Sequence, residues 1–470
     1  MPDTTPDPAQ PPPTTPAAAP GPTTDTPTGT LPGPLTGRQR IVIVGGGAGG
    51  LELARKLGTR HGRKHDITLV DCVRSHVWKP LLHEVATGSL DANLDELSYR
   101  AHCYKWGIRY FYGMMEGVDR TRRELLIAPL HDIDGSLLMG RHRIPYDLLV
   151  VAIGSITNDF GTKGARQNCV FLDDRPAADA FRNRLLNQCM RVSRAALTGM
   201  PGEHEVRVAI VGAGATGVEL AAELYSAAGA LRQYGLEHFD ESRLKVTLIE
   251  AGPRILPALP EKLSHAAQTE LERLGVRVLT GTPVTEVTDT AVITTTGEAI
   301  PAELRLWAAG VRGSAVLENT DGLEVNRWSQ LVVRPTLQTT RDDRIFAIGD
   351  CCSCTLPGTD RAVPPRAQAA HQMADTVYFN IRRLLRGRAL RNFVYRDHGS
   401  LVSLSRFSTV GSLMGNLVGG AMAIEGRLAR LAYQSLYQMH LLAVHGKLKG
   451  VILILLGQVN AIIRPRIKVH

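Results

Sequence analysis

Short apolar runs that end in glycine mark the beginning of two similar segments of the chain. Residues 41–44 (Ile-Val-Ile-Val) precede a glycine-rich turn and a helical pattern, and residues 67–70 form a second apolar run. Fully apolar runs of this length are typical of strands buried in a parallel sheet. The same order returns at residues 208–211, with a helical pattern from Val218 and an apolar run at 246–249. The pattern predicts two α/β units.

Three further apolar runs also end in glycine, and they predict returning strands. These runs lead into Gly154, Gly310 and Gly349. When one unit is inserted inside another, the last strand of the outer unit comes after the whole inner unit in the sequence. Residues 345–348, followed by Gly349 and Asp350, fit that last position. We therefore expect an α/β fold with two Rossmann-like dinucleotide-binding domains, the second inserted in the first.

The first turn has the spacing of a dinucleotide-binding motif. Gly45, Gly47 and Gly50 satisfy G-x-G-x-x-G, in which the glycines permit a tight turn, close approach to a pyrophosphate and packing of helix on strand. The helix N-terminus would then face the phosphates. Asp71 follows the second strand, 21 residues after Gly50, where a carboxylate can bind ribose hydroxyls. The complete order of strand, turn, helix, strand and acid is much more specific than the glycines alone.

The second turn repeats this motif with a longer crossover. Gly212, Gly214 and Gly217 have the same spacing, but the acid, Glu250, comes 33 residues after Gly217. A helical stretch over residues 225–239 can absorb the extra length. Glu250 would repel a 2′-phosphate, which favours NAD(H) over NADP(H). The alternative for either motif is a tight turn that binds no ligand.

Composition excludes several classes of protein and shows that the two ends of the chain differ from the rest. A chain of 470 residues with 44% hydrophobic and 21% charged residues is typical of a soluble multidomain protein. The seven cysteines, an odd and scattered set, do not form a disulfide framework. Residues 1–38 are rich in Pro and Thr and contain no aromatic residue, so we expect a disordered tail. Seven of the nine net positive charges lie in the last 44 residues.

The basic C-terminal segment predicts attachment to a membrane surface. Residues 427–445 place apolar side chains near one stripe at helical spacing, and residues 451–456 form another apolar run. Neither segment provides the roughly 20 apolar residues that a spanning helix needs. Residues 407–424 are broken by glycines and favour strands and turns. An apolar stripe beside basic residues suits an amphipathic helix on an anionic membrane surface. A dimer interface or packing on the core are the alternatives, and nucleic acid is disfavoured because no recognition motif accompanies the charge.

Four further sequence stretches narrow the interpretation. They lie at residues 78–88 (WKPLLHEVATG), 217–220 (GVEL), 364–372 (PPRAQAAHQ) and 398–404 (HGSLVSL). These stretches resemble those of the bacterial type II NADH dehydrogenases, which are NADH:quinone oxidoreductases of the two-dinucleotide-binding-domain flavoprotein family. The resemblance implies FAD at the first motif and NADH at the second. The residues that it adds to the FAD site are Lys79, Gly154, Gly349, Asp350, Ala367 and Gln368, and those added to the NADH site are Glu219 and Gly310.

The resemblance also implies the reaction and its location. Hydride from NADH would reduce the flavin, and two electrons would then pass to a membrane quinone, either menaquinone or ubiquinone. Gln368 and Gln372 would contact the flavin edge and the quinone head group, and Glu219 would orient NADH or relay a proton. We expect a peripheral respiratory enzyme on the cytoplasmic face of the bacterial inner membrane. The sequence leaves a homodimer open and assigns no metal site. His371 is a further candidate for proton transfer, although a lone histidine in such a segment more often has a structural role.

The expected domain boundaries follow from the motifs. Residues 39–165 and 321–395 would form the FAD-binding domain, residues 166–320 the NADH-binding domain, and residues 396–470 a membrane-anchoring region.

Two other functions remain as alternatives. A sulfide:quinone oxidoreductase would need a redox pair of cysteines, for which Cys351, Cys354 and Cys169 are candidates, but it would not need an intact NADH motif. The helix expected from Gly50 to Arg60 lacks the cysteine pair of disulfide reductases. A flavin- and nucleotide-binding membrane sensor without catalytic activity could keep both glycine motifs. Bleaching of the flavin by NADH, with recovery on addition of a quinone analogue, distinguishes the enzyme from the sensor.

Overall fold

The computed structural model describes residues 35–91, 96–198, 204–404, 408–415, 420–425 and 427–463. The expected tail, residues 1–38, therefore lies almost entirely outside the described residues, as do the basic residues of the 464–470 segment.

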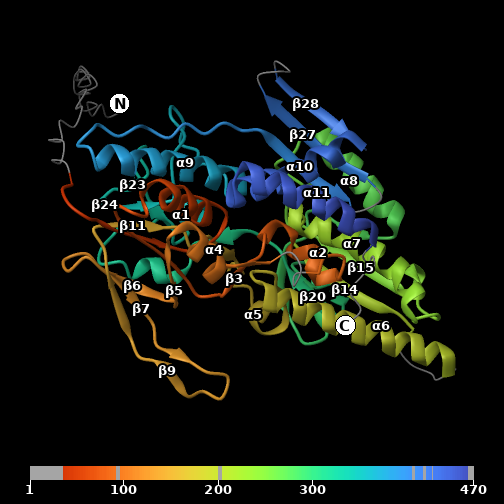
Figure 1. Ribbon diagram of the computed structural model, residues 1–470. Coiled ribbons are helices and arrows are strands. Elements are labelled where there is room, and N and C mark those ends of the chain that lie inside the picture. Colours follow the sequence, from red (N-terminus) through yellow and green to blue (C-terminus); the bar gives the residue numbers. More distant parts are fainter. Residues whose placement is uncertain are drawn as a thin grey trace, which may run out of the picture.

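The first sheet has six strands, with the first strand of the chain near its centre (Figure 1). Strand β1 pairs in parallel with β11 on one side and with β2 on the other. All four residues of β11 are fully buried, which explains why its sequence is apolar without alternation. Helices α1 (Ala48–His61) and α9 (Ala367–Leu384) pack against each other beside this sheet. In order, the strands are β23 (Gln338–Thr339), β24 (Asp342–Ala347), β11 (Leu148–Val151), β1 (Arg40–Val44), β2 (Asp66–Asp71) and β5 (Arg109–Tyr112).

The second sheet repeats the arrangement of the first. Its five strands are all parallel, and β14, which precedes the second glycine turn, again lies between its returning strand and the strand that ends at the acid. Helix α7 (Ala215–Leu231) follows the turn. The helix ends earlier than the expected 239, because a 3₁₀ turn at Arg232–Tyr234 leads into Gly235 at a positive φ of 95°. In order, the strands are β13 (Val170–Phe171), β20 (Leu304–Trp307), β14 (Val206–Val211), β15 (Leu244–Ile249) and β16 (Arg277–Leu279).

Both units also contain a three-stranded antiparallel sheet just before the returning strand. This feature extends the internal repeat beyond the glycine motifs. In the first unit the strands are β6 (Met115–Asp119), β7 (Glu124–Ile127) and β10 (His142–Pro145), and in the second they are β17 (Val284–Val287), β18 (Ala291–Thr294) and β19 (Ala299–Pro301).

The second unit is inserted in the first, as the order of motifs predicted. Strands β23 and β24 return to the first sheet only after the second sheet is complete. The outgoing chain at β12 (Ile156–Thr157) pairs with the returning chain at β21 (Val311–Arg312). The indole N–H of Trp307 donates to the carbonyl oxygen of Asn158 over 2.8 Å at the same crossing.

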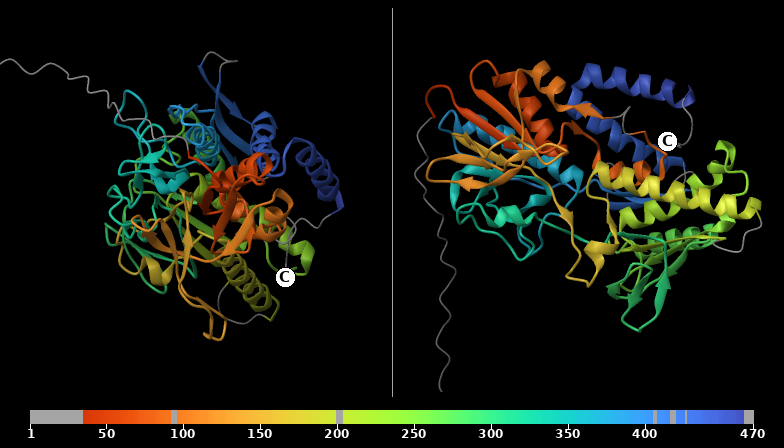
Figure 2. Two further views of the ribbon diagram at one scale, coloured as in Figure 1. Left: turned by 60° about the vertical axis from the view of Figure 1, so that its left-hand side comes forward. Right: turned by 90° about the horizontal axis from the view of Figure 1, so that it is seen from below.

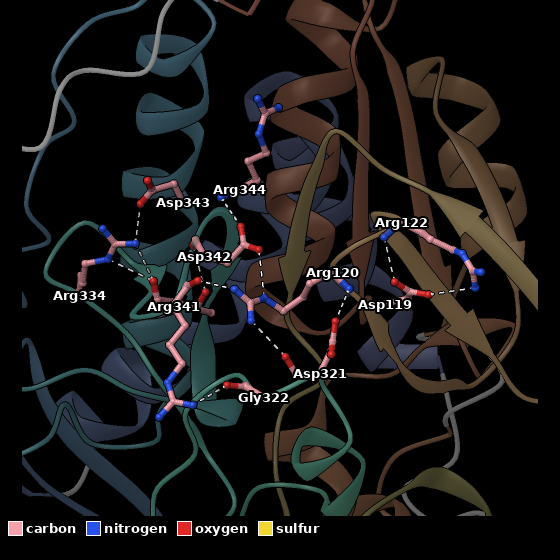
Figure 3. Close-up of polar contacts among 11 residues, drawn as sticks. Asp119, Arg120, Arg122, Asp321, Gly322, Arg334, Arg341, Asp342, Asp343 and Arg344 are labelled. Carbon is pink, nitrogen blue, oxygen red and sulfur yellow. Dashed lines mark hydrogen bonds and ion pairs between the residues drawn. The ribbon is translucent and has the colours of Figure 1, made fainter.

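A polar cluster ties the returning segment to the first part of its domain (Figure 3). The Arg120 guanidinium donates to the carbonyl oxygens of Asp321 and Arg341 and pairs with the Asp342 carboxylate at 3.2 Å. The Asp321 carboxylate in turn accepts from the Arg120 backbone N–H at 2.9 Å. These contacts join segments more than 200 positions apart in the sequence.

The C-terminal region packs across the junction between the two units. It forms an antiparallel sheet of β26 (Gly399–Leu404), β27 (Ser408–Gly415) and β28 (Gly420–Glu425), as the glycine-broken pattern predicted, and then helices α10 (Arg427–His445) and α11 (Lys447–Ile463). Figure 2 shows the two helices, in blue, on the outside of the molecule. Val402 and Leu404 join the core of the second unit, whereas Val444 joins that of the first. Within the described part of the chain, no helix combines the length and apolar character that crossing a membrane requires.

Candidate functional site

The first glycine turn forms a cradle at the N-terminus of α1. Gly45 has a positive φ of 101°, and a Cβ at Gly50 would lie 1.9 Å from the Gly45 carbonyl oxygen, so neither position tolerates a side chain without a shift. A Cβ at Gly47, by contrast, would meet no atom within 4 Å. Gly47 is also the N-cap of α1 and provides no side-chain cap, which leaves the helix amides available for an anion.

Asp71 closes the first cradle from the end of β2. Its carboxylate accepts hydrogen bonds from the backbone N–H groups of Gly46, at 2.5 Å, and Val73, at 2.9 Å. Burial raises the pKa of Asp71, although these backbone donors lower it. The Tyr99 hydroxyl donates to the Gly46 carbonyl oxygen at 2.7 Å and holds the other side of the turn.

The second glycine turn has the same construction. Gly212 has a φ of 103°, and a Cβ at Gly217 would lie 2.0 Å from the Gly212 carbonyl oxygen. Gly214 is the uncapped N-cap of α7, and a Cβ there would meet no atom within 4 Å. Glu250 follows β15 and accepts from the backbone N–H groups of Ala213 and Gly252, both at 2.8 Å. The two acids therefore hold their glycine turns in equivalent ways.

Gly310 lies at the crossing between the two units, beside the second cradle. It has a φ of 65°, and its carbonyl oxygen accepts from the Asn158 backbone N–H at 3.3 Å. The ring of Phe160 occupies the space that a Cβ would need. Glycine is therefore required by both the backbone and the packing.

A third group of expected residues meets at the carboxyl ends of β11 and β24. The Lys79 ammonium donates to the Ser155 carbonyl oxygen at 3.1 Å, and the Ser155 hydroxyl donates to the Asp350 carboxylate at 3.0 Å. Burial raises the pKa of Asp350, while the Ser155 hydroxyl and the Lys79 charge lower it. Gly154 has a positive φ of 73°, and a Cβ there would meet no atom within 4 Å. Gly349 has the same φ of 73°, and its N–H points at the sulfur of Met373.

The N-terminus of α9 lies next to this group. The helix begins at Ala367 after Arg366, which provides no side-chain cap. The Gln368 amide donates to Asp397 at 3.2 Å and to the Gly399 carbonyl oxygen at 3.1 Å. The Gln372 amide exchanges two hydrogen bonds with the backbone of Arg396, at 2.8 and 2.9 Å. Both glutamines therefore hold the extended segment that leads into β26.

Glu219 joins three elements near the junction of the two units. It is 7% exposed, on α7, and its carboxylate accepts from the Ser403 backbone N–H of β26 at 3.1 Å. The other carboxylate oxygen lies 3.7 Å from Nδ1 of His83 on α2 (Leu82–Thr87). Burial lowers the pKa of His83 to about 4, so this ring is neutral at physiological pH. Glu219 and Gln368 thus contact opposite ends of the same strand.

The structure also reveals a group that sequence reasoning did not assemble. Glu52 of α1 pairs with Nδ1 of His371 on α9, and Nε2 of His440 on α10 lies 3.0 Å from Nε2 of His76. Trp78 stacks on His440 with a centroid distance of 3.8 Å. The sequence had already indicated His371 as a candidate for proton transfer, but no local pattern related it to Glu52, His76 or His440.

The candidate redox cysteines show the features of packing residues. The Cys351 thiol contacts the Ile348 carbonyl oxygen at 3.2 Å, and burial raises its pKa to about 12. Cys352 and Cys354 are also buried, and burial raises the pKa of Cys169 to about 12. Protonated thiols of this kind are poor nucleophiles.

Comparison with known proteins agrees with this geometry. The model of the pyridine nucleotide-disulphide oxidoreductase family matches residues 39–374. The type II NADH:quinone oxidoreductase of Haemophilus influenzae is 47% identical over 448 residues, which cover 92% of this chain and 100% of that protein. The chain belongs to the type II NADH:quinone oxidoreductase family. The resemblance inferred from the four sequence stretches is thereby confirmed.

Other members and solved structures extend the comparison. The type II NADH:quinone oxidoreductase of Staphylococcus aureus strain RF122 is 28% identical over 82% of this chain and 92% of its own length. NDH2 from Plasmodium falciparum, solved in complex with NADH, matches with a TM-score of 0.74 at 19% identity, covering 92% of this chain and all of that one. The sulfide:quinone oxidoreductase of Aquifex aeolicus matches with a TM-score of 0.66 at 17% identity, over 87% of this chain and 92% of that one. Type II oxidoreductases therefore share their fold with enzymes of other activities.

Proposed function

We propose that this protein is an FAD-dependent NADH:quinone oxidoreductase that transfers electrons without pumping protons. The observation that best supports this function is the pair of equivalent glycine cradles, one in each unit. The chain also belongs to the family of the type II enzymes. Bound FAD supplies the redox chemistry, taking a hydride from NADH and passing two electrons to a quinone. The protein's contribution is to bind and orient these molecules.

The first cradle fits the pyrophosphate of FAD. Gly47 is open while Gly45 and Gly50 are closely packed, so the amides at the start of α1 can approach a phosphate. Asp71 is placed for ribose hydroxyls, and Asp350 for the hydroxyls of the ribityl chain. The N-terminus of α9, at Ala367 and Gln368, would direct its positive dipole toward the flavin, where negative charge develops on reduction.

The second cradle fits NADH by the same reasoning. Gly214 is open, Gly217 is packed, and Glu250 carries the negative charge that disfavours a 2′-phosphate. Glu219 is buried on the helix that begins at this cradle and contacts β26, which Gln368 also contacts. We assign Glu219 to the junction between nicotinamide and flavin, and Gln368 and Gln372 to the quinone side.

Helix α11 is the proposed contact with the membrane. The described part of α10 carries buried His440 and Val444, and Ala443 accepts a hydrogen bond from Arg55, so this end of α10 packs on the body of the protein. Helix α11 instead exposes large apolar side chains beside the exposed Lys447 and Lys449. The apolar residues are Leu448, Val451, Ile452, Leu453, Leu455 and Leu456.

This membrane contact is tested by removing α11 without disturbing α10. Deletion of residues 446–470 should abolish sedimentation with vesicles that contain anionic phosphatidylglycerol and should leave NADH binding unchanged. Binding of the full-length protein to vesicles of phosphatidylcholine alone measures how much the apolar side chains contribute to membrane affinity. Continued binding of the truncated protein to the anionic vesicles would contradict the assignment. The cytoplasmic face of the bacterial inner membrane is the proposed site, because a lipid-soluble quinone must enter from the bilayer.

The reaction is tested by comparing electron donors and acceptors at steady state. NADH, NADPH and sulfide are each offered with menaquinone and ubiquinone analogues. We expect turnover with NADH, much slower turnover with NADPH because of Glu250, and none with sulfide because the candidate thiols are buried or protonated. Preference for sulfide would favour the sulfide:quinone oxidoreductase, whereas flavin bleaching by NADH without turnover of either quinone would favour the sensor.

A further inference from the structure

A pair formed by a buried acid and a partly buried histidine connects two helices that flank the proposed flavin site. Glu52 of α1 is 5% exposed and lies 319 positions before His371 of α9 in the sequence. One carboxylate oxygen of Glu52 pairs with Nδ1 of His371, and the other pairs with the Lys56 ammonium at 2.6 Å. Asp375, one turn beyond His371, holds Lys56 from its other side. The pair is therefore fixed by a network of charges.

The charges define which nitrogen of the His371 ring is available. Burial raises the pKa of Glu52, but the hydrogen bond and charge of His371 and the Lys56 ammonium outweigh burial, so its pKa is lowered. An ionised Glu52 accepts a hydrogen bond and keeps the proton on Nδ1 of His371. Nε2 of the same ring is buried and has no hydrogen-bond partner within the described part of the chain. A buried ring nitrogen without a partner is costly unless a ligand satisfies it.

His371 is placed to meet a ligand at the start of α9. It lies one turn after Ala367 and Gln368, and side chains on a helix lean toward its N-terminus. The ring of Trp78 flanks it at 6.0 Å and 27° between planes, directly before Lys79 of the proposed flavin site. The free nitrogen is therefore expected next to the site that would receive the quinone head group.

The neighbouring histidines cannot serve in the same role. Burial lowers the pKa of His440 well below its ordinary value, an effect that His76, His371 and His445 reinforce, and burial lowers the pKa of His76 to about 4. Both rings are therefore neutral near pH 7 and share one hydrogen bond. The charged and titratable groups that interact with His371 or with its partners are Glu52 and Lys56 on α1, His76, Asp375 on α9 and His440 on α10. Arg55 on α1 interacts with Glu52, and His445 on α10 interacts with His440.

We propose that His371 donates a proton through Nε2 to a quinone oxygen, with Glu52 as the positioning residue that holds the imidazolium. This proposal rests on the proposed function and supplies a step that it lacks. A quinone needs two electrons and two protons to become a quinol, whereas the hydride of NADH carries two electrons and one proton. The imidazolium of His371 gives up its Nε2 proton, and the Nδ1 proton stays on the ring, hydrogen-bonded to Glu52. The neutral ring regains a proton from water after the quinol leaves.

The test separates the two half-reactions in the FAD-loaded enzyme. In anaerobic stopped-flow mixing, H371N and E52Q should bleach the flavin with NADH at the wild-type rate. Reoxidation by a ubiquinone or menaquinone analogue should slow by about 100-fold in H371N, the usual scale of general acid catalysis. Reoxidation in E52Q should also slow, but by less than in H371N, because the proton-donating ring remains and only the group that positions it is lost. The matched controls are H265N and E272Q, exposed positions on helix α8 (Glu261–Leu274), which should change neither half-reaction.

Two further measurements distinguish proton transfer from a purely structural role. In H371A, added imidazole should restore reoxidation by the quinone, because a small acid can occupy the vacated space. Proton NMR of the enzyme, without turnover, should show a strongly deshielded ring N–H resonance that H371N and E52Q abolish and that both controls retain.

The outcomes separate this proposal from the proposed function. Failure of every quinone to reoxidise the wild-type enzyme would refute the proposed function. Normal reoxidation by wild type and by H371N would overturn the proton-donor role alone, as would loss of bleaching by NADH in H371N with folded, FAD-loaded protein. Persistence of the deshielded resonance in E52Q would refute the pairing with Glu52.

Discussion

The two glycine positions of the second cradle predict opposite consequences for stability and for NADH binding. A Cβ at Gly217 would lie 2.0 Å from the Gly212 carbonyl oxygen, so G217A requires the helix or the turn to move. Overpacking of this kind costs about 1–3 kcal/mol. For a domain of 150–250 residues, each kcal/mol lowers Tm by about 2–4 °C.

G214A places the same methyl group in open space. A Cβ at Gly214 meets no atom within 4 Å, and its φ of −71° with ψ of −173° is extended backbone that any residue adopts. The change at the helix N-cap costs less than about 1 kcal/mol. The methyl group occupies the approach of the pyrophosphate to the amides of α7, so NADH affinity should fall at least tenfold, or by about 1.4 kcal/mol.

Thermal unfolding of the FAD-loaded enzyme and fluorescence titration with NADH measure the two effects separately. G217A should lower Tm by several degrees, whereas G214A should keep Tm close to wild type and lose NADH affinity. G47A and G50A in the first cradle provide the equivalent pair for FAD retention. Wild-type affinity for NADH in G214A would refute the assignment of the second cradle, and an unchanged Tm in G217A would refute the packing argument.

Three other predictions follow from individual contacts. E219Q should lower quinone turnover at least tenfold, on the scale of general acid and base catalysis, and stopped-flow measurement of both half-reactions would detect it; two unchanged rates would remove the residue from the mechanism. Stability should fall as pH decreases from about 6.5 to about 4, because the pKa of buried His83 is about 4 when folded and near its ordinary 6.5 when unfolded, so the unfolded state binds more protons in this window. Tm measured across this range should therefore fall less in H83Q than in wild type, and an equal fall would contradict the contribution of this ring. R120A should lower Tm by a few degrees through loss of the contacts in Figure 3, whereas R122A, whose side chain is 68% exposed, should not; equal effects would show that the cluster does not join the two segments.

The parts of the fold that could be predicted from the sequence are those encoded locally. A strand buried on both faces is apolar throughout, and a glycine turn between such a strand and a helix carries its own spacing, so both cradles were located within a few residues. The three-stranded antiparallel sheets were missed because their strands mix polar with apolar residues. Strand β6, for example, has the sequence MEGVD, and its two acidic residues are only partly buried. The end of α7 was misplaced because Gly235, rather than the apolar pattern, determines where the helical turns stop.

The contacts that complete the site depend on residues far apart in the sequence. Glu219 meets Ser403 across 184 positions, and Glu52 meets His371 across 319. No local pattern relates such residues, because their proximity follows from insertion of one unit in the other and from packing of the C-terminal region over both. The partner of the apolar stripe of α10 could not be predicted from the sequence either. A helix packed on protein and a helix packed on lipid show the same periodicity of apolar residues. Burial of His440 and Val444 indicates protein packing at that end of α10. Met439 of the same helix is nevertheless 54% exposed, and the other exposed large apolar residues of the C-terminal region lie on α11.

Anaerobic double-mixing stopped flow follows both proposed electron transfers, from NADH to flavin and from flavin to quinone, in a single experiment. The FAD-loaded enzyme is first mixed with one equivalent of NADH and then with a quinone analogue, while flavin absorbance is recorded. We expect NADH to bleach the flavin and the quinone to restore its absorbance within a single turnover, and we expect G214A to be impaired in the first step only. Flavin that stays reduced after addition of both menaquinone and ubiquinone analogues would refute the proposed NADH:quinone oxidoreductase activity.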